Sequence, residues 1–427
     1  MNKYFRAVKA RRYALLLFVS LAALYASSYF QRTAVPGTIF NALQSSCGLS
    51  AEEISGLGAY MVTVYAFFQL IAGVLVDKYG GSRVVICGGI PFCTGVLLFP
   101  MSLGNLPLMY TARILVGIGS SVMYLSLLRE SDRLFGRKNY AVILGIIYFI
   151  GYSGGLCGTL PFAALCQKYS WQSLLLWIGI FSTCLYLIFL YCCKKNPPAP
   201  VGTGKFEFSR LIIILKNPLT WISCYCTSVN FACYFILQSV FGMKFLEDVA
   251  KMAPAPASAV IFSLTLICMF TLLGGGVISR LLNNRRKPIV LISTSIALGY
   301  NLLMLAAVYF GLPPFFFALA YFLSAFASGS SGTFVIVSQE VNSPGTQTQS
   351  AAFMNMCCYL AVAIASLLIG KLLDSFVDPA IFSSGEKVIY PDKAYMILFT
   401  LLLIPTGISF ILSLFIPETK GKFLIQD

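Results

Sequence analysis

The sequence predicts an all-helical membrane protein with twelve spans in two six-helix halves. Its 427 residues are 58% hydrophobic and only 11% charged, whereas soluble domains carry about 25% charged residues. Uncharged runs such as Tyr13 to Phe30 recur along the chain, and each approaches the ~20 residues with which a helix crosses the hydrocarbon core. Barrel strands instead alternate over about ten residues. Helices are therefore the predicted spans.

Glycines, prolines and charged residues separate the apolar runs and so mark the ends of each span in order. The first run follows the basic segment MNKYFRAVKARR, as in a signal peptide, but it exceeds a signal core and no A-x-A site follows it. We expect it to be a retained helix. The spans are expected at residues 13–43, 54–76, 84–102, 107–129, 140–164, 171–193, 218–243, 256–281, 288–310, 313–337, 349–374 and 394–416.

A polar segment rich in Pro and Gly, KKNPPAPVGTGKFEFSR, separates the sixth span from the seventh. Such a composition is typical of a linker. The sequence therefore predicts an N-terminal six-helix half at residues 1–193, a cytoplasmic linker at 194–217 and a C-terminal six-helix half at 218–427.

The formal net charge of +15 is unevenly distributed. With the N-terminus inside, 22 of the 30 Lys and Arg residues lie in the inner loops and tails or at the inner span ends, and only Arg32 and Arg113 lie inside spans away from their ends. This is the positive-inside pattern. It predicts an integral, multi-pass protein of the plasma (bacterial inner) membrane with both termini cytoplasmic. Because the loops account for the charge, no nucleic-acid partner is expected.

Residues that carry catalytic or metal chemistry form no recognisable pattern. The chain has no histidine, and its fourteen cysteines lie mostly in apolar runs without a paired C-x-x-C, which is typical of small packing residues. No metal and no cofactor are expected. No nucleophile–base constellation is visible either, so the protein is not expected to be an enzyme.

The two halves resemble each other in sequence. GVLVDKYGGSR at 73–83 corresponds to GGVISRLLNNR at 275–285, an offset of 202 residues. GSSVMYLSLLRE at 119–130 corresponds to GSSGTFVIVSQE at 329–340, and both segments end in Glu. Internal symmetry of this kind is typical of transporters with two related halves around a midplane site.

The loop after the second span resembles the signature of the major facilitator superfamily, G-x-L-x-D-R/K-x-G-R/K-R/K. The matching residues are Gly73, Leu75, Asp77, Lys78 and Gly80. Gly81 and Ser82 replace the two basic positions, and a basic residue reappears one place late as Arg83. The resemblance implies the major facilitator fold and contacts that form and break as two halves rock. In physical terms, Asp77 beside Lys78 and Arg83 can brace neighbouring helix ends.

The fourth span adds RILVGIG, in which Arg113, Gly117 and Gly119 are similar to the R-x-x-x-G-x-G pattern of the same superfamily. The ending PETKGK is also frequent in it. We assign gating or structural roles to these residues and to the loop motif, and we leave open a contact of Arg113 with substrate.

Arg32 is the residue whose position most needs a reason. If the first helix ends near Leu43, Arg32 lies eleven residues deep, which is roughly 16 Å at ~1.5 Å per residue and close to the midplane. A charge there costs at least ~2.5 kcal/mol unless a cavity, counter-ion or ligand compensates it. If the span instead runs from Tyr13, Arg32 lies near the outer interface, where it could extend to the headgroups.

All fifteen acidic residues lie in expected loops, tails or helix ends, so we expect an anionic ligand to supply the charge opposite Arg32. The segment YFQRTAVPGTI resembles the helix-1 pattern Y-x-x-R of the organophosphate/phosphate antiporters and the anion:cation symporters, in which the arginine contacts the anion. In the symporters, carboxylates stand where this chain has Gln31 and Ser120. The resemblance therefore implies exchange of anions, or coupling that uses no carboxylate.

The seventh span offers neutral groups where related antiporters carry a second basic residue: Asn230, Tyr234 and Gln238. With Gln31, they are the predicted secondary contacts of a small organic monoanion anchored by Arg32. Further aromatic and amide residues could line the cavity, namely Tyr65, Gln69, Tyr124, Tyr152, Tyr300, Asn301, Tyr321 and Asn355.

The leading interpretation is thus a secondary transporter of a small organic anion, acting as a monomer in the lipid bilayer. Two alternatives remain at this point. The 14% aromatic content also suits a drug or siderophore exporter of the same superfamily. The chain could also be a non-transporting membrane receptor or scaffold.

Overall fold

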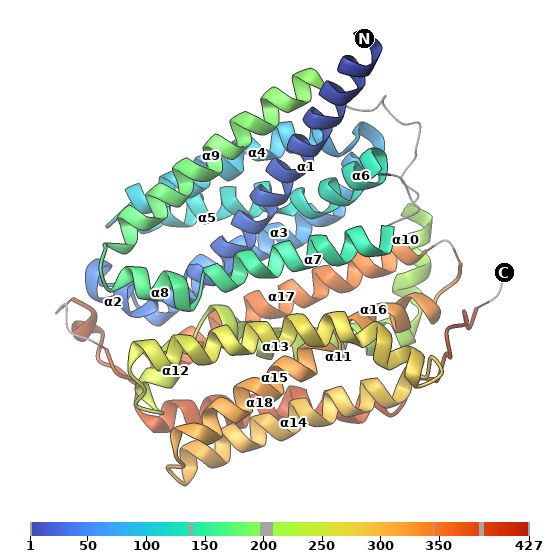
Figure 1. The fold of residues 1–427 in the computed structure, drawn as a ribbon. Coiled ribbons are helices and arrows are strands. Elements are labelled where there is room, and N and C mark those ends of the chain that lie inside the picture. The colour runs from blue at the N-terminus through green and yellow to red at the C-terminus, as the bar shows by residue number, and fades with distance from the viewer. Residues whose placement is uncertain (1, 136–139, 197–207, 345, 384–387, 426–427) are drawn as a thin grey trace. The chain divides into compact units, whose positions relative to one another are not determined.

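The computed structural model describes residues 2–135, 140–196, 208–344, 346–383 and 388–425, and these ranges contain helices and turns without a β-strand (Figure 1). The elements are α1 (Asn2–Ala34), η1 (Gly37–Ile39), α2 (Phe40–Cys47), α3 (Ala51–Tyr79), α4 (Gly81–Met101), α5 (Leu106–Ser121), α6 (Met123–Phe135), α7 (Tyr140–Cys157), α8 (Leu160–Cys166), α9 (Trp171–Lys195), α10 (Phe208–Lys216), α11 (Pro218–Ser239), α12 (Gly242–Asp248), α13 (Pro254–Leu281), α14 (Lys287–Tyr309), α15 (Pro314–Gly329), α16 (Ser331–Glu340), α17 (Gln347–Asp374), η3 (Pro379–Ser383) and α18 (Asp392–Ser413).

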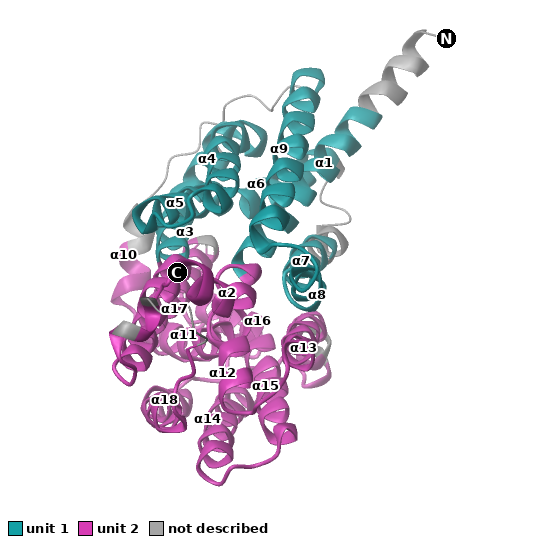
Figure 2. Cartoon of the chain, turned by 90° about the vertical axis from the view of Figure 1, so that its left-hand side faces the viewer, with its two compact units in different colours: residues 1–32, 60–206 teal, residues 33–59, 207–427 magenta. Residues whose placement is uncertain are grey.

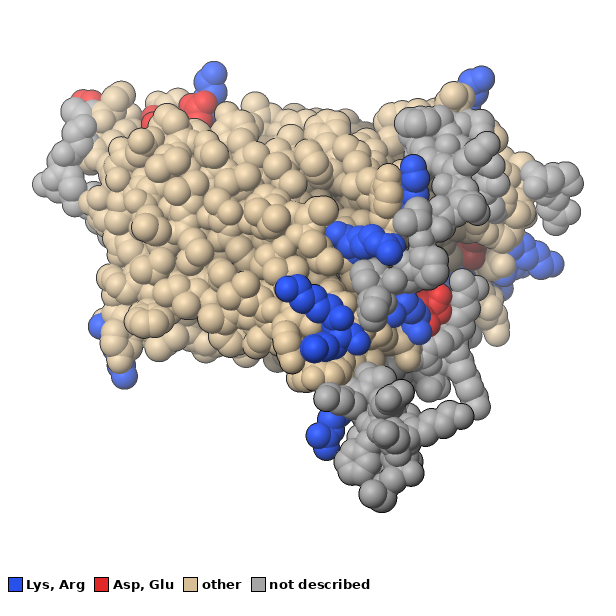
Figure 3. Space-filling view, turned by 90° about the horizontal axis from the view of Figure 1, so that it is seen from above, with Lys and Arg blue, Asp and Glu red and all other residues tan. Residues whose placement is uncertain are grey.

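Twelve segments among the described residues are long and apolar enough to cross a membrane. The expected all-helical fold with twelve spans is therefore confirmed, and most span ends differ from the expected ones by a few residues. The seventh span ends earlier, at Ser239, because the residues beyond it form the separate helix α12. On the face shown in Figure 3, Lys and Arg gather toward one end beside a broad area without charged side chains.

The chain forms two compact units (Figure 2). Unit 1 comprises Met1–Arg32 and Tyr60–Phe206, and unit 2 comprises Thr33–Ala59 and Glu207–Asp427. The segment Thr33–Ala59 therefore packs with the second half of the chain, although unit 1 flanks it in sequence. This segment contains the end of the first span and the start of the second.

The first span is interrupted just after Arg32. The expected continuous helix over 13–43 is wrong in this detail, since α1 ends at Ala34 and the chain resumes as η1 and α2. Pro36 explains the break because it has no backbone N–H to donate and disfavours helical geometry at Val35. Arg32 thus lies in the last turn of α1.

Within unit 2, Asp374 holds the start of α3. Its two carboxylate oxygens accept hydrogen bonds from the backbone N–H groups of Ala51, at 2.8 Å, and Glu52, at 2.7 Å. The first N–H groups of a helix lack partners inside the helix, and a negative charge there is favourable. A side chain at the end of α17 therefore caps a helix that begins more than 300 residues earlier.

Further contacts tie Thr33–Ala59 to the rest of unit 2. Asn41 donates to the Glu247 carboxylate at 2.7 Å, and Gln44 donates to the Tyr390 hydroxyl at 2.9 Å. A Cβ atom at Gly37 would lie 2.6 Å from the carbonyl oxygen of Ser239. The backbones approach closely there, and only glycine fits.

The two glutamates of the sequence repeat have equivalent roles. In unit 1, Glu130 of α6 accepts from the backbone N–H of Ser82, in the first turn of α4, at 2.8 Å, and from Arg133 at 2.6 Å. In unit 2, Glu340 of α16 pairs with Arg286, the N-cap residue of α14, at 3.2 Å. Glu130 thus connects the end of the fourth span to the start of the third. Glu340 connects the end of the tenth span to the start of the ninth in the same way.

The PETKGK segment supports the same helix start in unit 2. The carboxylate of Glu418 accepts from the backbone N–H groups of Arg286, at 2.7 Å, and Lys287, at 3.2 Å. Thr419 donates a hydrogen bond to Glu340. In this chain the motif therefore has a structural role as a cap for α14.

Candidate functional site

The environment of Arg32 is aromatic. Its side chain is 5% exposed, and the guanidinium carbon lies over two tyrosine rings, 4.7 Å from the centroid of Tyr29 and 4.0 Å from that of Tyr65. Tyr29 precedes Arg32 by three residues on α1, so both lie on one helix face. Tyr65 comes from α3. A ring face stabilises a cation by about 0.5 to 2 kcal/mol, most strongly where water is excluded.

More tyrosines surround this pair within unit 1. Tyr25 lies 5.1 Å from Tyr29 between ring centroids, Tyr152 of α7 lies 5.8 Å from Tyr29, and Tyr124 of α6 lies 5.8 Å from Tyr25. The hydroxyl groups of Tyr124 and Tyr148 are 2.9 Å apart. We call the set the tyrosine cluster; its members are Tyr25, Tyr29, Tyr65, Tyr124, Tyr148 and Tyr152.

The tyrosine cluster and Arg32 bring four helices of unit 1 together around one cation. Sequence reasoning named Tyr65, Gln69, Tyr124 and Tyr152 as possible lining residues, and the Gln69 amide donates to the Tyr65 hydroxyl at 3.1 Å. It noted Tyr29 only as the tyrosine of the Y-x-x-R pattern, and it did not single out Tyr25 or Tyr148. The i, i+3 spacing of Tyr29 and Arg32 was the signal that places both residues on one helix face.

Gln31 and Arg113 meet next to this group. The Gln31 side chain is buried, and its amide Nε2 has no hydrogen-bond partner within the described residues. Its main-chain oxygen accepts from Arg113 Nη2 at 3.2 Å. Arg113, on α5, is fully buried and also donates to the Met61 sulfur at 2.8 Å. Arg113 is thus bonded to protein groups.

The three predicted residues of the seventh span belong to unit 2. Asn230, Tyr234 and Gln238 are four residues apart along α11, so they form a stripe on one helix face. Asn230 donates to Ser293 at 3.0 Å and Gln238 to Thr265 at 2.9 Å. The side-chain oxygen of Asn230 accepts no hydrogen bond among the described residues, which leaves it available to a donor.

The loop motif forms a tight turn after α3. Gly80 has a φ of +82°, which disfavours other residues. Arg83 donates to the Tyr79 carbonyl at 3.0 Å, and the Lys78 ammonium lies 5.2 Å from the Tyr79 ring. A Cβ atom at Gly73 would lie 3.9 Å from the Leu125 side chain, an ordinary van der Waals distance, so packing does not require glycine there. The side chain of Asp77 lies outside the described residues.

The glycines of the fourth span permit close helix packing. A Cβ atom at Gly117 would lie 2.5 Å from the Met61 carbonyl oxygen, and one at Gly119 would lie 2.6 Å from the Gly88 carbonyl oxygen. Contacts this short require glycine. The two residues therefore fix the distances of α5 from α3 and α4.

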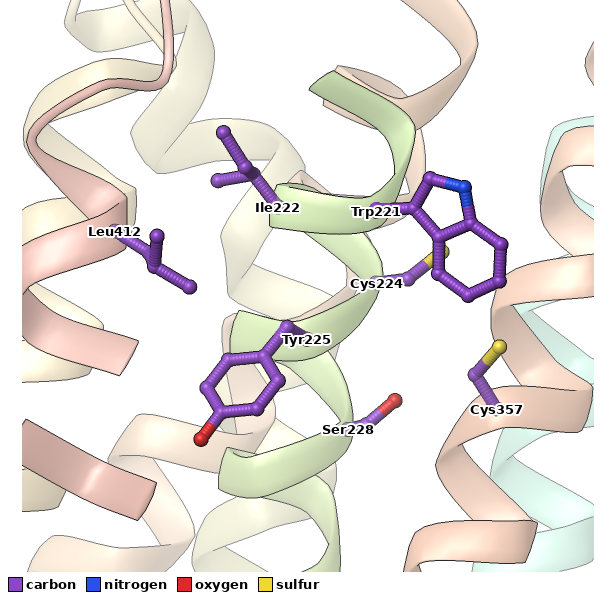
Figure 4. Close-up of a pocket in the computed structure, with 7 residues that line it drawn as sticks. All are labelled: Trp221, Ile222, Cys224, Tyr225, Ser228, Cys357 and Leu412. Carbon is purple, nitrogen blue, oxygen red and sulfur yellow. The ribbon is translucent and has the colours of Figure 1, made fainter. Parts of the chain in front are cut away.

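A cavity of about 380 Å³ lies in unit 2, around the first turns of α11. Figure 4 shows Trp221, Cys224 and Cys357 on one side of this helix and Leu412 on the other. No charged residue lines it, and it includes none of the predicted anion-binding residues. Such a lining suits an apolar group rather than an anion.

A fully buried ion pair on α12 was not anticipated from the sequence. The Lys244 ammonium and the Asp248 carboxylate are 2.9 Å apart, with neither side chain exposed. Lys244 also donates to the Val388 carbonyl, and Tyr395 donates to Asp248 at 2.9 Å. Burial raises the pKa of Asp248, while the charge of Lys244 opposes that rise. The i, i+4 spacing was visible, but the burial depends on residues about 140 positions away.

Comparison with known proteins identifies the class. The family model of the Major Facilitator Superfamily matches residues 21–366, and the chain therefore belongs to that superfamily of membrane transporters. The twelve candidate spans agree with this membership.

The chain is similar to Monocarboxylate transporter 7 of Homo sapiens, with 27% identity over 176 residues. The alignment covers 38% of this chain and 32% of that protein, so it spans about a third of the relative's length.

Solved structures of similar fold cover nearly the whole chain. One is a bacterial homolog of the human lysosomal transporter Spinster in an inward-facing, unoccupied conformation, with a TM-score of 0.73, 15% identity and coverage of 95% of this chain and 98% of that one. Another is the D-xylose–proton symporter, with a TM-score of 0.71, 15% identity and coverage of 96% and 99%. At this identity, the likeness establishes the fold.

Proposed function

We propose that this protein is a secondary transporter of a small organic monoanion that works by alternating access, with Arg32 as the anchor of the anion. The observation that carries the proposal is the guanidinium of Arg32 buried in a membrane-spanning segment over the rings of Tyr29 and Tyr65. Ring faces stabilise the charge without neutralising it. A carboxylate fits the N–H fork of the guanidinium in bidentate fashion.

A monocarboxylate is the favoured class of cargo. One basic anchor matches one negative charge, and the phenol and amide groups around it suit the remaining body of a small acid. The similarity to a protein named Monocarboxylate transporter 7 supports the same class. We propose Gln31, Asn230, Tyr234 and Gln238 as secondary contacts.

The mechanism we propose uses two six-helix halves, residues 1–193 and 218–427, joined by the linker 194–217. Cargo at Arg32 neutralises the guanidinium and favours the closed arrangement, since a ligand shifts an equilibrium only through its different affinities for the two states. Exchange of anions, or coupling without a carboxylate, agrees with Gln31 and Ser120 at the places discussed above. We further propose a monomer in the plasma (bacterial inner) membrane with cytoplasmic termini, as the distribution of Lys and Arg supports.

The test is counterflow in liposomes. A thermal-shift screen of purified protein with lactate, pyruvate, benzoate and acetate selects the probe, and uptake is then measured with and without a pH gradient. Arg32→Ala should abolish uptake. Arg32→Lys should reduce it severely, because lysine keeps the charge and loses the planar fork.

Membrane insertion and thermal stability of both variants serve as the control. Normal counterflow by Arg32→Ala would refute the anchor. Binding of bulky amphipathic compounds, with no response to any carboxylate, would favour the drug-exporter alternative.

A further inference from the structure

Arg113 connects the two helices that build the Arg32 site. It is fully buried on α5, and its Nη2 atom donates to the Gln31 carbonyl at 3.2 Å and to the Met61 sulfur at 2.8 Å. Gln31 immediately precedes Arg32 on α1. Met61 precedes Tyr65 by one turn on α3. The Arg113 side chain therefore contacts Gln31, which is next to Arg32 in the sequence, and Met61, which lies one helical turn from Tyr65.

The contact with Gln31 occurs in the last turn of α1, which ends at Ala34. The carbonyl groups there point toward the negative end of the helix dipole, where a cation is favourable. The guanidinium of Arg113 therefore adds both a hydrogen bond and a favourable charge to the turn that carries Arg32.

The contact with Met61 occurs where α5 and α3 touch. One turn after Arg113, a Cβ atom at Gly117 would lie 2.5 Å from the Met61 carbonyl oxygen. The backbones of α5 and α3 are therefore in direct contact at this residue. The base of the Arg113 side chain is held in a fixed position relative to α3.

We propose that Arg113 is a positioning residue of the transport site: by bonding Gln31 and Met61 together, it holds the guanidinium of Arg32 over the ring of Tyr65. This inference rests on the proposed function of Arg32. It assigns Arg113 no contact with cargo. Removal of Arg113 should therefore change the affinity for the anion through Arg32 while leaving the transport cycle intact.

The first test is structural and needs no substrate. In cryo-EM structures of the full chain in lipid nanodiscs, Arg113→Gln should move the Arg32 guanidinium from 4.0 Å to beyond the ~6 Å limit of a cation–π contact with Tyr65. Arg113→Lys keeps a charged donor for the Gln31 carbonyl and should retain the contact. An unmoved Arg32 in Arg113→Gln would overturn the proposal.

The second test is kinetic, with radiolabelled pyruvate counterflow as the readout. Arg113→Gln should raise KM about 3- to 30-fold, the range expected for the loss of a desolvated cation–π contact, with kcat nearly unchanged. Arg113→Lys should restore most of the affinity. Met61→Leu, which removes the sulfur acceptor and keeps the volume, should give a smaller rise and remains informative if Arg113→Gln does not fold.

Two comparisons separate this role from general stability. Met109→Leu, an equally conservative change at a buried methionine one turn earlier on α5, should leave KM unchanged. Tyr65→Leu combined with Arg113→Gln should raise KM by less than the product of the single effects, since both act on one contact. If the effects of the two substitutions on KM multiply in the double variant, the positioning role is wrong. A fall in kcat without a rise in KM in Arg113→Gln would also contradict it.

The two proposals fail differently. If Arg32→Ala transports normally, the proposed anchor is wrong whatever Arg113 does. If Arg32→Ala is inactive while Arg113→Gln keeps both the wild-type KM and the position of Arg32, only the positioning role is wrong.

Discussion

At the residue scale, the ring and the hydroxyl of Tyr65 have different partners. Their contributions to the stabilisation of the Arg32 charge can therefore be measured separately. The guanidinium carbon lies 4.0 Å from the ring centroid, while the hydroxyl of Tyr65 accepts from Gln69. The ring face stabilises the charge. The two parts of the side chain can be removed one at a time.

Tyr65→Phe should leave the KM for the anion within about 2-fold of wild type, and Tyr65→Leu should raise it about 3- to 30-fold, since only leucine removes the π face. Initial rates of counterflow at varied anion concentration measure both. The phenylalanine variant is the matched control. Equal loss in the two variants would show that the hydroxyl contributes instead.

How much of the site could be predicted from sequence differs from residue to residue. Arg32 was predictable because a lone charge in an apolar run needs a physical reason. Tyr65 was only one of many aromatic candidates, since its approach to Arg32 depends on the packing of α3 against α1. The burial of Lys244 and Asp248 depends on Val388 and Tyr395, and no local pattern encodes it.

At the element scale, the spans were predictable and their interruptions were less so. Apolar length alone determines whether a segment can cross the membrane, and all twelve spans were found. The end of α1 at Ala34 follows from Pro36, a residue visible in the sequence. A proline within a membrane helix can also produce only a kink, so the sequence left both outcomes open. The cap of α3 by Asp374 could not be predicted from the sequence, because the two partners are more than 300 residues apart.

Asp374→Asn should weaken this cap. The amide keeps one acceptor oxygen but loses the charge and one of the two hydrogen bonds to the backbone of Ala51 and Glu52. We expect a loss of about 1 to 2 kcal/mol in the free energy of unfolding, measured as a lower midpoint of thermal unfolding in detergent. Asp392→Asn, an exposed first-turn carboxylate of α18, should have a smaller effect. An equal effect at both positions would contradict the special role of Asp374.

At the scale of the whole molecule, the two compact units do not coincide with the two halves of the sequence. Thr33–Ala59 packs within unit 2 through Asn41, Gln44 and the cap at Asp374. If the halves move against each other during transport, these contacts inside unit 2 have to break and form again in every cycle. They are therefore suitable points at which to arrest transport.

A cleavable cross-link tests this requirement. Asn41→Cys with Glu247→Cys, in a Cys47→Ser background because Cys47 ends the same helix α2, places two thiols where a 2.7 Å hydrogen bond joined the side chains. A short bifunctional methanethiosulfonate should reduce counterflow to the level of protein-free liposomes. Reduction should restore it.

Two variants that each carry only one of the added cysteines, treated with the same reagent, control for modification alone, including modification of the native cysteines. Full transport by the cross-linked protein would mean that Thr33–Ala59 never separates from the rest of unit 2.

The boundary between the units falls directly after Arg32. The first segment of unit 1 ends at Arg32, and Thr33 begins the segment that packs within unit 2. The proposed anion anchor and the first residue of the other unit are therefore neighbours in the backbone, with no linker between them.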